Sequence, residues 1–269
     1  MYTHVKAIAI KGGNTVDEMC QLAKKRLAEW GMTALKYSII APIYPIIRKA
    51  EMKPHIERFA AVRETIGDDV DLAIDFHGRV TPASAPRLID ALEPYHPFFI
   101  EEPVLPDNVE EMVDISRRTS VPIAAGERLF GRWGYRELIE KQAVRVLQPD
   151  LCHAGGIFEA RKIAAMGEVY HMYVAPHNPL GPISLAACLQ LDACIPNFLA
   201  QEFPGIPEGW DLGKELLKEP FEIKNGYIDV PTKPGLGVEI NEDALVTLAD
   251  AGWRKNQYVT YEDGSQADW

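Results

Sequence analysis

The sequence contains little cysteine and no long apolar run. Its 269 residues include four cysteines, and none forms a CxxC pair, so neither a thiolate metal site nor a disulfide framework is expected. We interpret the cysteines as reduced packing residues of a cytoplasmic protein. No apolar run reaches the roughly 20 residues that a membrane helix needs, and the N-terminus lacks the basic-then-apolar pattern of a signal peptide. We therefore expect a cytoplasmic chain that does not bind a membrane.

Positive charge is also in short supply. The chain has 28 Lys and Arg against 39 Asp and Glu, a net charge of −11. Such a balance is unfavourable for binding the phosphate backbone of nucleic acids or an anionic lipid surface. The composition therefore excludes a nucleic-acid partner and favours a small molecule. With 47% hydrophobic residues and no biased segment, the chain can bury one large core.

Short apolar runs alternate with amphipathic patterns along the chain. Buried parallel strands are predicted at 5–10, 34–40, 71–75, 98–101, 121–125, 144–148, 172–175 and 198–201. Helices are predicted between them at 15–30, 54–66, 86–92, 109–118, 134–142, 158–169 and 183–191. This order, without hairpin signals, predicts a TIM-type barrel over residues 1–202. The segment 203–269, punctuated by Pro and Gly, is predicted to be a C-terminal extension that packs on the barrel.

Three carboxylates follow three successive predicted strands at equal spacing. The steps from Asp75 to Glu101 and from Glu101 to Glu127 are both 26 residues, about the length of one strand, one helix and their loops. Such side chains would point into one space at the C-terminal ends of the strands, where barrel active sites lie. Taken singly, a strand-end Asp is as often only a helix cap. Three hard oxygen ligands around one point predict a single Mg²⁺ ion.

Other candidate residues fall at the same end of the predicted strands. His77 comes two residues after Asp75, so both side chains share a face of an extended segment. His177 follows the seventh strand, and Asp150 ends the sixth, where its carboxylate could orient the imidazole and raise its basicity. Glu202 ends the last strand.

Two cations are weaker candidates. Lys36 lies in the second strand, where its ammonium could meet an anionic substrate or could equally be a solvated lysine. Arg128 follows Glu127 directly and is a second candidate for substrate binding. Glu102 follows Glu101, and strand alternation places it on the opposite face, so we expect it to be structural.

Seven motifs in order together resemble the mandelate racemase branch of the enolase superfamily, from about Glu18 to Trp269. They are DFHGR (75–79), FIEEPV (99–104), AAGER (124–128), QPDLCHAGGI (148–157), APHNPLGP (175–182), QE (201–202) and KPGLGVEI (233–240). The resemblance implies a (β/α)7β-like barrel with Asp75, Glu101 and Glu127 as Mg²⁺ ligands. It also implies His177 with Asp150 as the general base, His77 as the general acid, and Glu202 beside the reacting carboxylate.

The resemblance further implies a reaction. A Mg²⁺-dependent enzyme of this kind would remove the α-proton of an aldonate, galactonate being the first choice, and expel the β-hydroxyl to give a 2-keto-3-deoxy acid. The histidine at position 77 favours dehydration. The alternatives are a dehydratase of another aldonate such as gluconate, a racemase or epimerase of the same branch, and a barrel without catalytic activity.

One part of the family's pattern is not found in this sequence. The chain begins at what reads as the first barrel strand, so the N-terminal α+β capping domain of the family is expected to be missing. That absence leaves open whether the site closes over a substrate. Barrels of this branch commonly assemble, which makes a homo-oligomer a further expectation.

Overall fold

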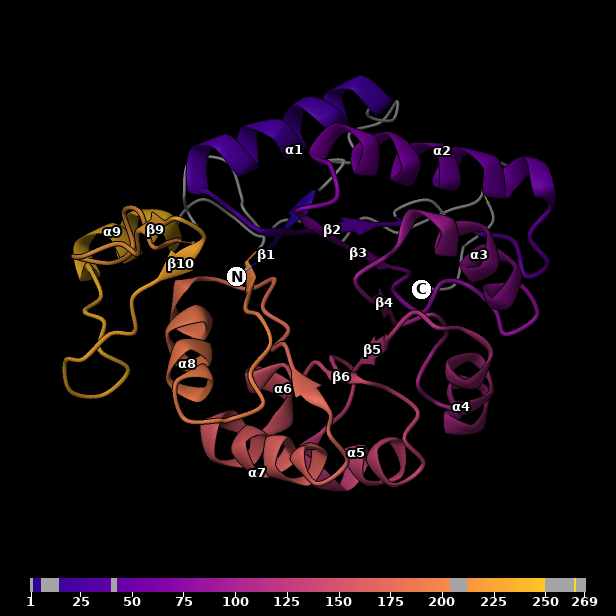
Figure 1. The fold of residues 1–269 in the computed structure, drawn as a ribbon. Helices are drawn as coiled ribbons and strands as arrows, with labels where there is room; N and C mark the ends of the chain where they lie inside the picture. Colours follow the sequence, from indigo (N-terminus) through magenta and orange to yellow (C-terminus); the bar gives the residue numbers. More distant parts are fainter. Residues whose placement is uncertain (1, 6–14, 40–42, 204–211, 250–263, 265–269) are drawn as a thin grey trace.

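The computed structural model describes residues 2–5, 15–39, 43–203, 212–249 and 264. Viewed along the barrel axis, a ring of helices surrounds the strands (Figure 1). The strands are β1 (Tyr2–Val5), β2 (Ala34–Ser38), β3 (Asp71–Asp75), β4 (Ile100–Glu101), β5 (Ile123–Ala125), β6 (Val146–Leu147), β7 (Tyr173–Val174) and β8 (Glu202–Phe203).

All eight strands belong to one parallel sheet, in the order β7-β6-β5-β4-β3-β2-β1-β8. The segment just before β8 joins the two ends of this order. Phe198 forms a parallel bridge with Val174 of β7, and the Leu199 amide donates to the Val174 carbonyl at 2.8 Å. The sheet therefore closes on itself, which confirms the predicted barrel.

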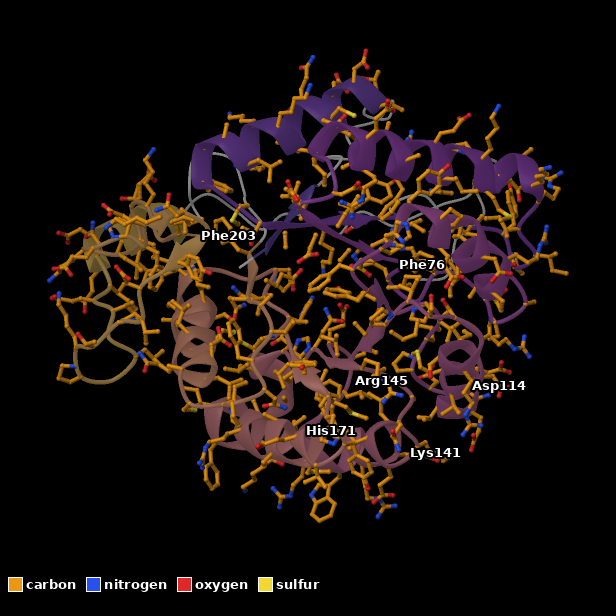
Figure 2. All side chains as sticks on the ribbon, in the orientation of Figure 1. Phe76, Asp114, Lys141, Arg145, His171 and Phe203 are labelled. Carbon is orange, nitrogen blue, oxygen red and sulfur yellow. The ribbon has the colours of Figure 1, made fainter. Side chains whose placement is uncertain are left out.

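The outer ring contains α1 (Val16–Trp30), α2 (Lys49–Ile66), α3 (Ala85–Leu92), α4 (Val109–Arg118), α5 (Gly131–Glu140), α7 (Gly156–Glu168) and α8 (Pro182–Asp192). A 3₁₀ turn (Glu93–Tyr95) follows α3, and the single-turn helix α6 (Leu151–Ala154) precedes α7. Charged side chains such as Asp114 and Lys141 lie on the outside of the ring (Figure 2). In the part of the chain that the structure describes, no helix combines the length and apolar character needed to cross a membrane.

Several predicted boundaries are wrong, including the helix predicted at 134–142, which covers Gly131–Glu140. The second helix begins at Lys49, five residues before the predicted start at Pro54, which instead lies inside the helix. Proline favours the first turn of a helix, but here Glu51 accepts from the Arg48 amide at 2.8 Å and fixes an earlier start. The first strand covers Tyr2–Val5, whereas most of the predicted range 5–10 lies outside the described residues. The last strand is assigned at Glu202–Phe203, just after the predicted range.

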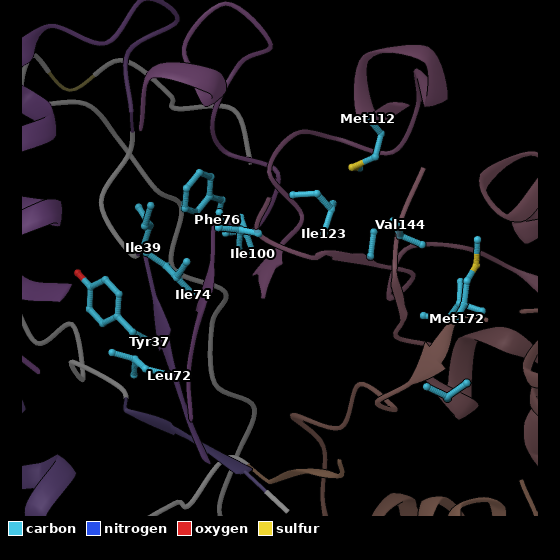
Figure 3. Close-up of a cluster of buried hydrophobic side chains, with 14 of the residues drawn as sticks. Tyr37, Ile39, Leu72, Ile74, Phe76, Ile100, Met112, Ile123, Val144 and Met172 are labelled. Carbon is cyan, nitrogen blue, oxygen red and sulfur yellow. The ribbon is translucent and has the colours of Figure 1, made fainter. Parts of the chain in front are cut away.

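Strand alternation divides the barrel core into two sides. Residues such as Tyr37, Ile39, Leu72 and Ile74 point away from the barrel axis and pack under the helices (Figure 3). The interior holds a separate apolar layer of mostly small residues: Ala34, Ala73, Phe99, Ala124, Val146, Ala175 and Ala200. Two residues further along each strand, on the same face, come Lys36, Asp75, Glu101, Gly126, Gln148, His177 and Glu202. The apolar layer is therefore the floor of a polar one.

The C-terminal extension adds the hairpin β9 (Ile223–Lys224) and β10 (Tyr227–Ile228) and the helix α9 (Glu242–Ala249). It lies beside α1 and α8 (Figure 1). The Gly226 amide donates to the Trp30 carbonyl at 2.7 Å, and Gln190 Nε2 donates to the Pro231 carbonyl at 2.8 Å. These bonds attach the extension to the helical ring. The domain boundary after residue 202 stays a prediction.

Candidate active site

Asp75, Glu101 and Glu127 come together at the C-terminal end of the barrel. Each offers an oxygen, and these oxygens all lie within 4.8 Å of one another. Asp75 and Glu101 end β3 and β4 and are direct partners in the register of these strands, while Glu127 comes two residues after β5. Parallel pairing explains the convergence, because it brings the carboxyl ends of neighbouring strands to one edge.

The three carboxylates fit a divalent cation of the Mg²⁺ type. All ligand atoms are hard oxygens, which Mg²⁺ prefers over Zn²⁺-type nitrogen and sulfur sets. Glu101 Oε1 is buried and has no hydrogen-bond partner among the described residues, so an oxygen remains for an ion. Burial raises the pKa of Asp75 and Glu101, and it raises the pKa of Glu127 to about 9. A cation would relieve the cost of ionising three buried, mutually repelling carboxyls.

Lys36 lies on the floor side of this cluster and is fully buried. Its Nζ lies 2.6 Å from Glu101 Oε2, 2.8 Å from Glu202 Oε1 and 3.7 Å from Asp75 Oδ2. The contact of Lys36 with a substrate stays a prediction. The structure shows that this ammonium neutralises part of the charge of the carboxylate layer.

His177 is held between two carboxylates. Its Nδ1 lies 2.9 Å from Asp150 Oδ2, and its Nε2 lies 3.3 Å from Glu127 Oε2. Burial works against the imidazolium, but Glu202, Asp150 and Glu127 outweigh it and raise the pKa of His177 to about 9. The structure therefore forms the His177–Asp150 pair that the sequence predicts.

Asp150 has two tasks. Its Oδ1 accepts the Cys152 amide at 2.7 Å and the His153 amide at 3.3 Å, so it caps α6. Burial opposes ionisation of Asp150, but the His177 hydrogen bond and the Cys152 amide lower the pKa of this carboxyl. The helix cap fixes the carboxylate, and the carboxylate fixes the ring.

His77 stands on the opposite side of the carboxylate cluster from His177. Its Nε2 lies 3.1 Å from Asp75 Oδ2, and its strand, β3, is four strands away from β7 in either direction around the barrel. Burial lowers the pKa of His77 to about 3, and the charge of Lys36 adds to this shift. Both effects favour the neutral form of the ring in the protein without ligands.

Arg128 contacts protein groups that the sequence did not connect to it. Its Nε donates to both carboxylate oxygens of Glu102, at 2.8 and 3.1 Å, and its Nη2 donates to the His77 carbonyl at 3.1 Å. Glu102 is completely buried. Burial raises the pKa of Glu102 to about 7, against the opposing effect of Arg128. Arg128 was predicted to bind substrate, which these contacts do not test.

Glu202 and Gln148 complete the polar layer. Glu202 Oε2 accepts the Asn178 amide at 2.8 Å, so this carboxylate joins β8 to the residue after His177. Gln148 is buried, and neither of its side-chain polar atoms has a partner among the described residues. Gln148 was not singled out from the sequence, but its position two residues before Asp150, at the end of an apolar run, was a usable signal.

Comparison with known proteins gives consistent matches. The family of Enolase C-terminal domain-like proteins matches residues 18–244. The D-galactonate dehydratases of Cronobacter sakazakii (strain ATCC BAA-894) and Variovorax paradoxus (strain S110) are 40% and 39% identical to the chain. Both matches cover 98% of this chain and 70% of the relative.

The solved structures agree with the barrel assignment. The mandelate racemase/muconate lactonizing enzyme from Sulfitobacter sp. superposes with a TM-score of 0.86 at 32% identity, over 100% of this chain and 68% of that one. A member of the enolase superfamily from Salmonella Typhimurium gives 0.83 at 30% identity, over 91% and 66%. The match to a mandelate racemase/muconate lactonizing enzyme from Labrenzia alexandrii DFL-11 covers 64% of that solved chain. The sequence therefore spans about two thirds of the length of the structures that it matches.

Proposed function

Because the chain belongs to the family of Enolase C-terminal domain-like proteins, we propose that it carries the active site of a Mg²⁺-dependent sugar-acid dehydratase. The observation that carries this proposal is the placement of two histidines on either side of the carboxylate cluster. His77 contacts Asp75, and His177 contacts Glu127. Dehydration needs one group that takes a proton and another that gives one, and this arrangement supplies both.

We propose an aldonate as the substrate, with D-galactonate as the first choice. This choice rests on the names of the two curated relatives and not on any residue of the barrel, because stereochemistry is not readable from the fold. The reaction removes the proton at C2 and the hydroxyl at C3, releases water, and leaves an enol that becomes a 2-keto-3-deoxy acid.

His177 is the proposed base. In the tautomer that donates Nδ1–H to Asp150, Nε2 carries the lone pair that takes the C2 proton. Asp150 keeps the ring in this orientation and stabilises the imidazolium that forms, as in other His–Asp pairs. In the metal-free protein the neighbouring carboxylates raise the pKa of His177 to about 9, and a cation held by Glu127 would lower this pKa and favour the neutral ring that takes the proton.

His77 is the proposed acid that protonates the departing C3 hydroxyl. Its ring is neutral in the ligand-free protein, since burial lowers its pKa to about 3. It must therefore gain its proton as the anionic substrate binds. A substrate carboxylate beside the ring would favour this, because nearby negative charge stabilises the imidazolium.

The remaining polar residues prepare the site for a negative substrate. Mg²⁺ held by Asp75, Glu101 and Glu127 would supply the positive charge that stabilises the enediolate formed when the C2 proton leaves. Lys36 adds a second positive charge next to Glu101, where we propose that it faces the substrate carboxylate. Glu202 is held by Lys36 and by the Asn178 amide, and we propose that it also lies beside the substrate carboxylate.

The first test is an assay of the purified chain with Mg²⁺ and a panel of aldonates, in which 2-keto-3-deoxy products are detected with a carbonyl-specific reagent. We expect turnover of D-galactonate that chelation abolishes and Mg²⁺ restores. Glu127→Gln is the matched variant, because it keeps the size of the side chain while removing one ligand charge. Deuterium exchange at C2 without water loss would instead indicate a racemase or an epimerase. Failure to bind Mg²⁺ would contradict the proposal.

A further inference from the structure

We propose that Glu102 and Arg128 are positioning residues that hold the turn carrying His77 and thereby control water loss. Neither residue has to contact the substrate for this. The effect on catalysis rests on the proposed dehydration, whereas the effect on the turn does not.

His77 occupies the tip of a tight turn with an unfavourable backbone. The Arg79 amide donates to the Phe76 carbonyl at 3.0 Å, and the two central residues, His77 and Gly78, have φ of 53° and 64°. Positive φ at both central positions is the mark of a type I′ turn, which favours glycine or asparagine. His77 is neither, so its conformation must be imposed by neighbouring groups.

Three neighbouring groups hold the turn. Asp75 Oδ1 accepts the His77 amide at 2.7 Å, the Glu102 carbonyl accepts the Gly78 amide at 2.9 Å, and Arg128 Nη2 donates to the His77 carbonyl at 3.1 Å. Asp75 ends β3, whereas Glu102 and Arg128 follow β4 and β5. A further bond runs from Arg79 Nη1 to the Ile39 carbonyl at 3.0 Å. Of these attachments, one uses the main-chain carbonyl of Glu102 and one the side chain of Arg128.

Glu102 and Arg128 also hold each other. Arg128 Nε lies 2.8 and 3.1 Å from the two carboxylate oxygens of Glu102, which places the guanidinium so that its other end reaches the His77 carbonyl. Glu102 has a φ of 37°, so the extended conformation of β4 ends at this residue. Only a planar, forked cation can span a carboxylate and a carbonyl in this way, and lysine cannot replace it.

Removal of the C2 proton depends on His177, and loss of the C3 hydroxyl depends on His77. A change in the turn that carries His77 should therefore affect the second step more than the first. Among the described residues, the hydrogen bond and ion pair of His177 go to Asp150 and Glu127 and not to the turn at His77. Arg128 Nη2 lies 3.9 Å from Glu127 Oε1, a longer contact than its bonds to Glu102 and to the His77 carbonyl, and Arg128→Lys keeps the positive charge beside Glu127. Loosening the turn should therefore leave removal of the C2 proton intact while it displaces the acid needed for loss of the C3 hydroxyl. General acid catalysis typically contributes about 10²- to 10⁴-fold to rate, so a misplaced acid should lower water loss by about 10- to 100-fold.

The first test measures the turn itself. Amide hydrogen exchange of Arg128→Lys and Glu102→Gln is compared with wild type and with Arg132→Lys. Arg132 is a matched control, because its Nη1 lies 2.9 and 2.7 Å from the two oxygens of Glu159, in a pair that belongs to the outer helices. We expect faster exchange at Gly78 and Arg79 in the first two variants only. Unchanged exchange there would overturn the proposal, whether or not the chain is active.

The second test measures C2 deuterium incorporation and water loss in the same variants. We expect incorporation within about 3-fold of wild type, water loss lowered by about 10- to 100-fold, and a double variant no worse than Arg128→Lys, as for residues of one unit. If Arg128 contacts the substrate directly, both steps fall together and KM rises, which would overturn the proposal. A wild-type chain that shows neither step would refute the proposed dehydration, and hydrogen exchange would still decide the role of Glu102 and Arg128.

Discussion

Lys36 Nζ lies 2.6 Å from Glu101 Oε2, so one predicted Mg²⁺ ligand is already paired with a buried cation. The same ammonium contacts Glu202 at 2.8 Å. Four carboxylates, of Asp75, Glu101, Glu127 and Glu202, share this end of the barrel. Lys36 and a bound cation therefore act on the same excess of negative charge, and loss of one should increase the dependence on the other.

We predict that Lys36→Met destabilises the metal-free protein by about 3 to 5 kcal/mol, the usual cost of leaving a buried charge without its partner. Added Mg²⁺ should stabilise the variant more than wild type, because the ion then meets one more uncompensated carboxylate. Urea unfolding in EDTA and in Mg²⁺ measures both effects. Lys53→Met is the control, since the Lys53 side chain is 70% exposed and lies 3.5 Å from Glu57. Equal stabilities of Lys36→Met and wild type in EDTA would contradict the prediction.

We predict that His177→Asn abolishes deuterium incorporation at C2 and that Asp150→Asn lowers it by about 10- to 100-fold, because a mis-oriented base loses much of its contribution. Asparagine keeps the cap of α6 that Asp150 forms, so the fold should be preserved. NMR of the substrate in D₂O measures the exchange.

The control for this experiment is His77→Asn, which should keep C2 exchange and lose dehydration, because its ring acts on the leaving group. His171→Asn replaces an exposed histidine and should match wild type in both steps. Undiminished exchange in His177→Asn would show that another group is the base.

The sequence was most informative about site residues that occupy equivalent positions at the ends of successive strands. Equal steps of 26 residues between the ends of successive apolar runs located Asp75, Glu101 and Glu127, and the structure brings their oxygens within 4.8 Å. Parallel pairing makes this possible, since equivalent positions on successive strands end at one edge. The same rule placed Asp150 within reach of His177.

The sequence was least informative where the backbone departs from regular geometry. Strand alternation assigns Glu102 to the opposite face, but a φ of 37° ends the strand at this residue. Glu102 is not a residue type that usually adopts positive φ, so the sequence did not indicate this end of the strand. The partners of Lys36 and Arg128 depend on side-chain reach across three strands, which spacing does not encode. The start of α2 was misplaced because the general preference of proline for a first turn competed with the local cap at Arg48 and Glu51.

We predict that Gly126→Ala destabilises the protein by about 2 to 3 kcal/mol and weakens Mg²⁺ binding. An added Cβ would lie 2.9 Å from the backbone N and C of Gln148, and the φ of 149° is unfavourable for any other residue. Since Glu127 follows directly, the backbone shift should move a metal ligand. Thermal unfolding and calorimetric Mg²⁺ titration measure the two effects. Gly134→Ala is the matched control, because its nearest neighbour would be Leu129 Cβ at 3.7 Å, and alanine should stabilise α5 slightly.

We predict that His55 makes the fold acid-sensitive independently of the catalytic site. His55 lies in α2 and is buried, its Nδ1 has no partner among the described residues, and burial lowers its pKa from 6.5 to about 4. Between these two pH values the unfolded chain binds a proton that the folded chain does not. Stability therefore increases from about pH 4 to about pH 6.5 and is complete above it, a contribution of up to about 3 kcal/mol.

The measurement is the free energy of unfolding in urea at a series of pH values between 4 and 7.5, for wild type and for His55→Gln, a side chain of similar size that does not titrate. The difference between the two curves isolates His55 from the carboxylates that also respond to acid. We expect the variant to lose less stability than wild type as the pH falls below 6.5, while His171→Gln, exposed on the surface, keeps the wild-type slope. Parallel curves for wild type and His55→Gln would contradict the prediction. They would mean that the protonated His55 ring is hydrogen-bonded or solvated in the folded protein.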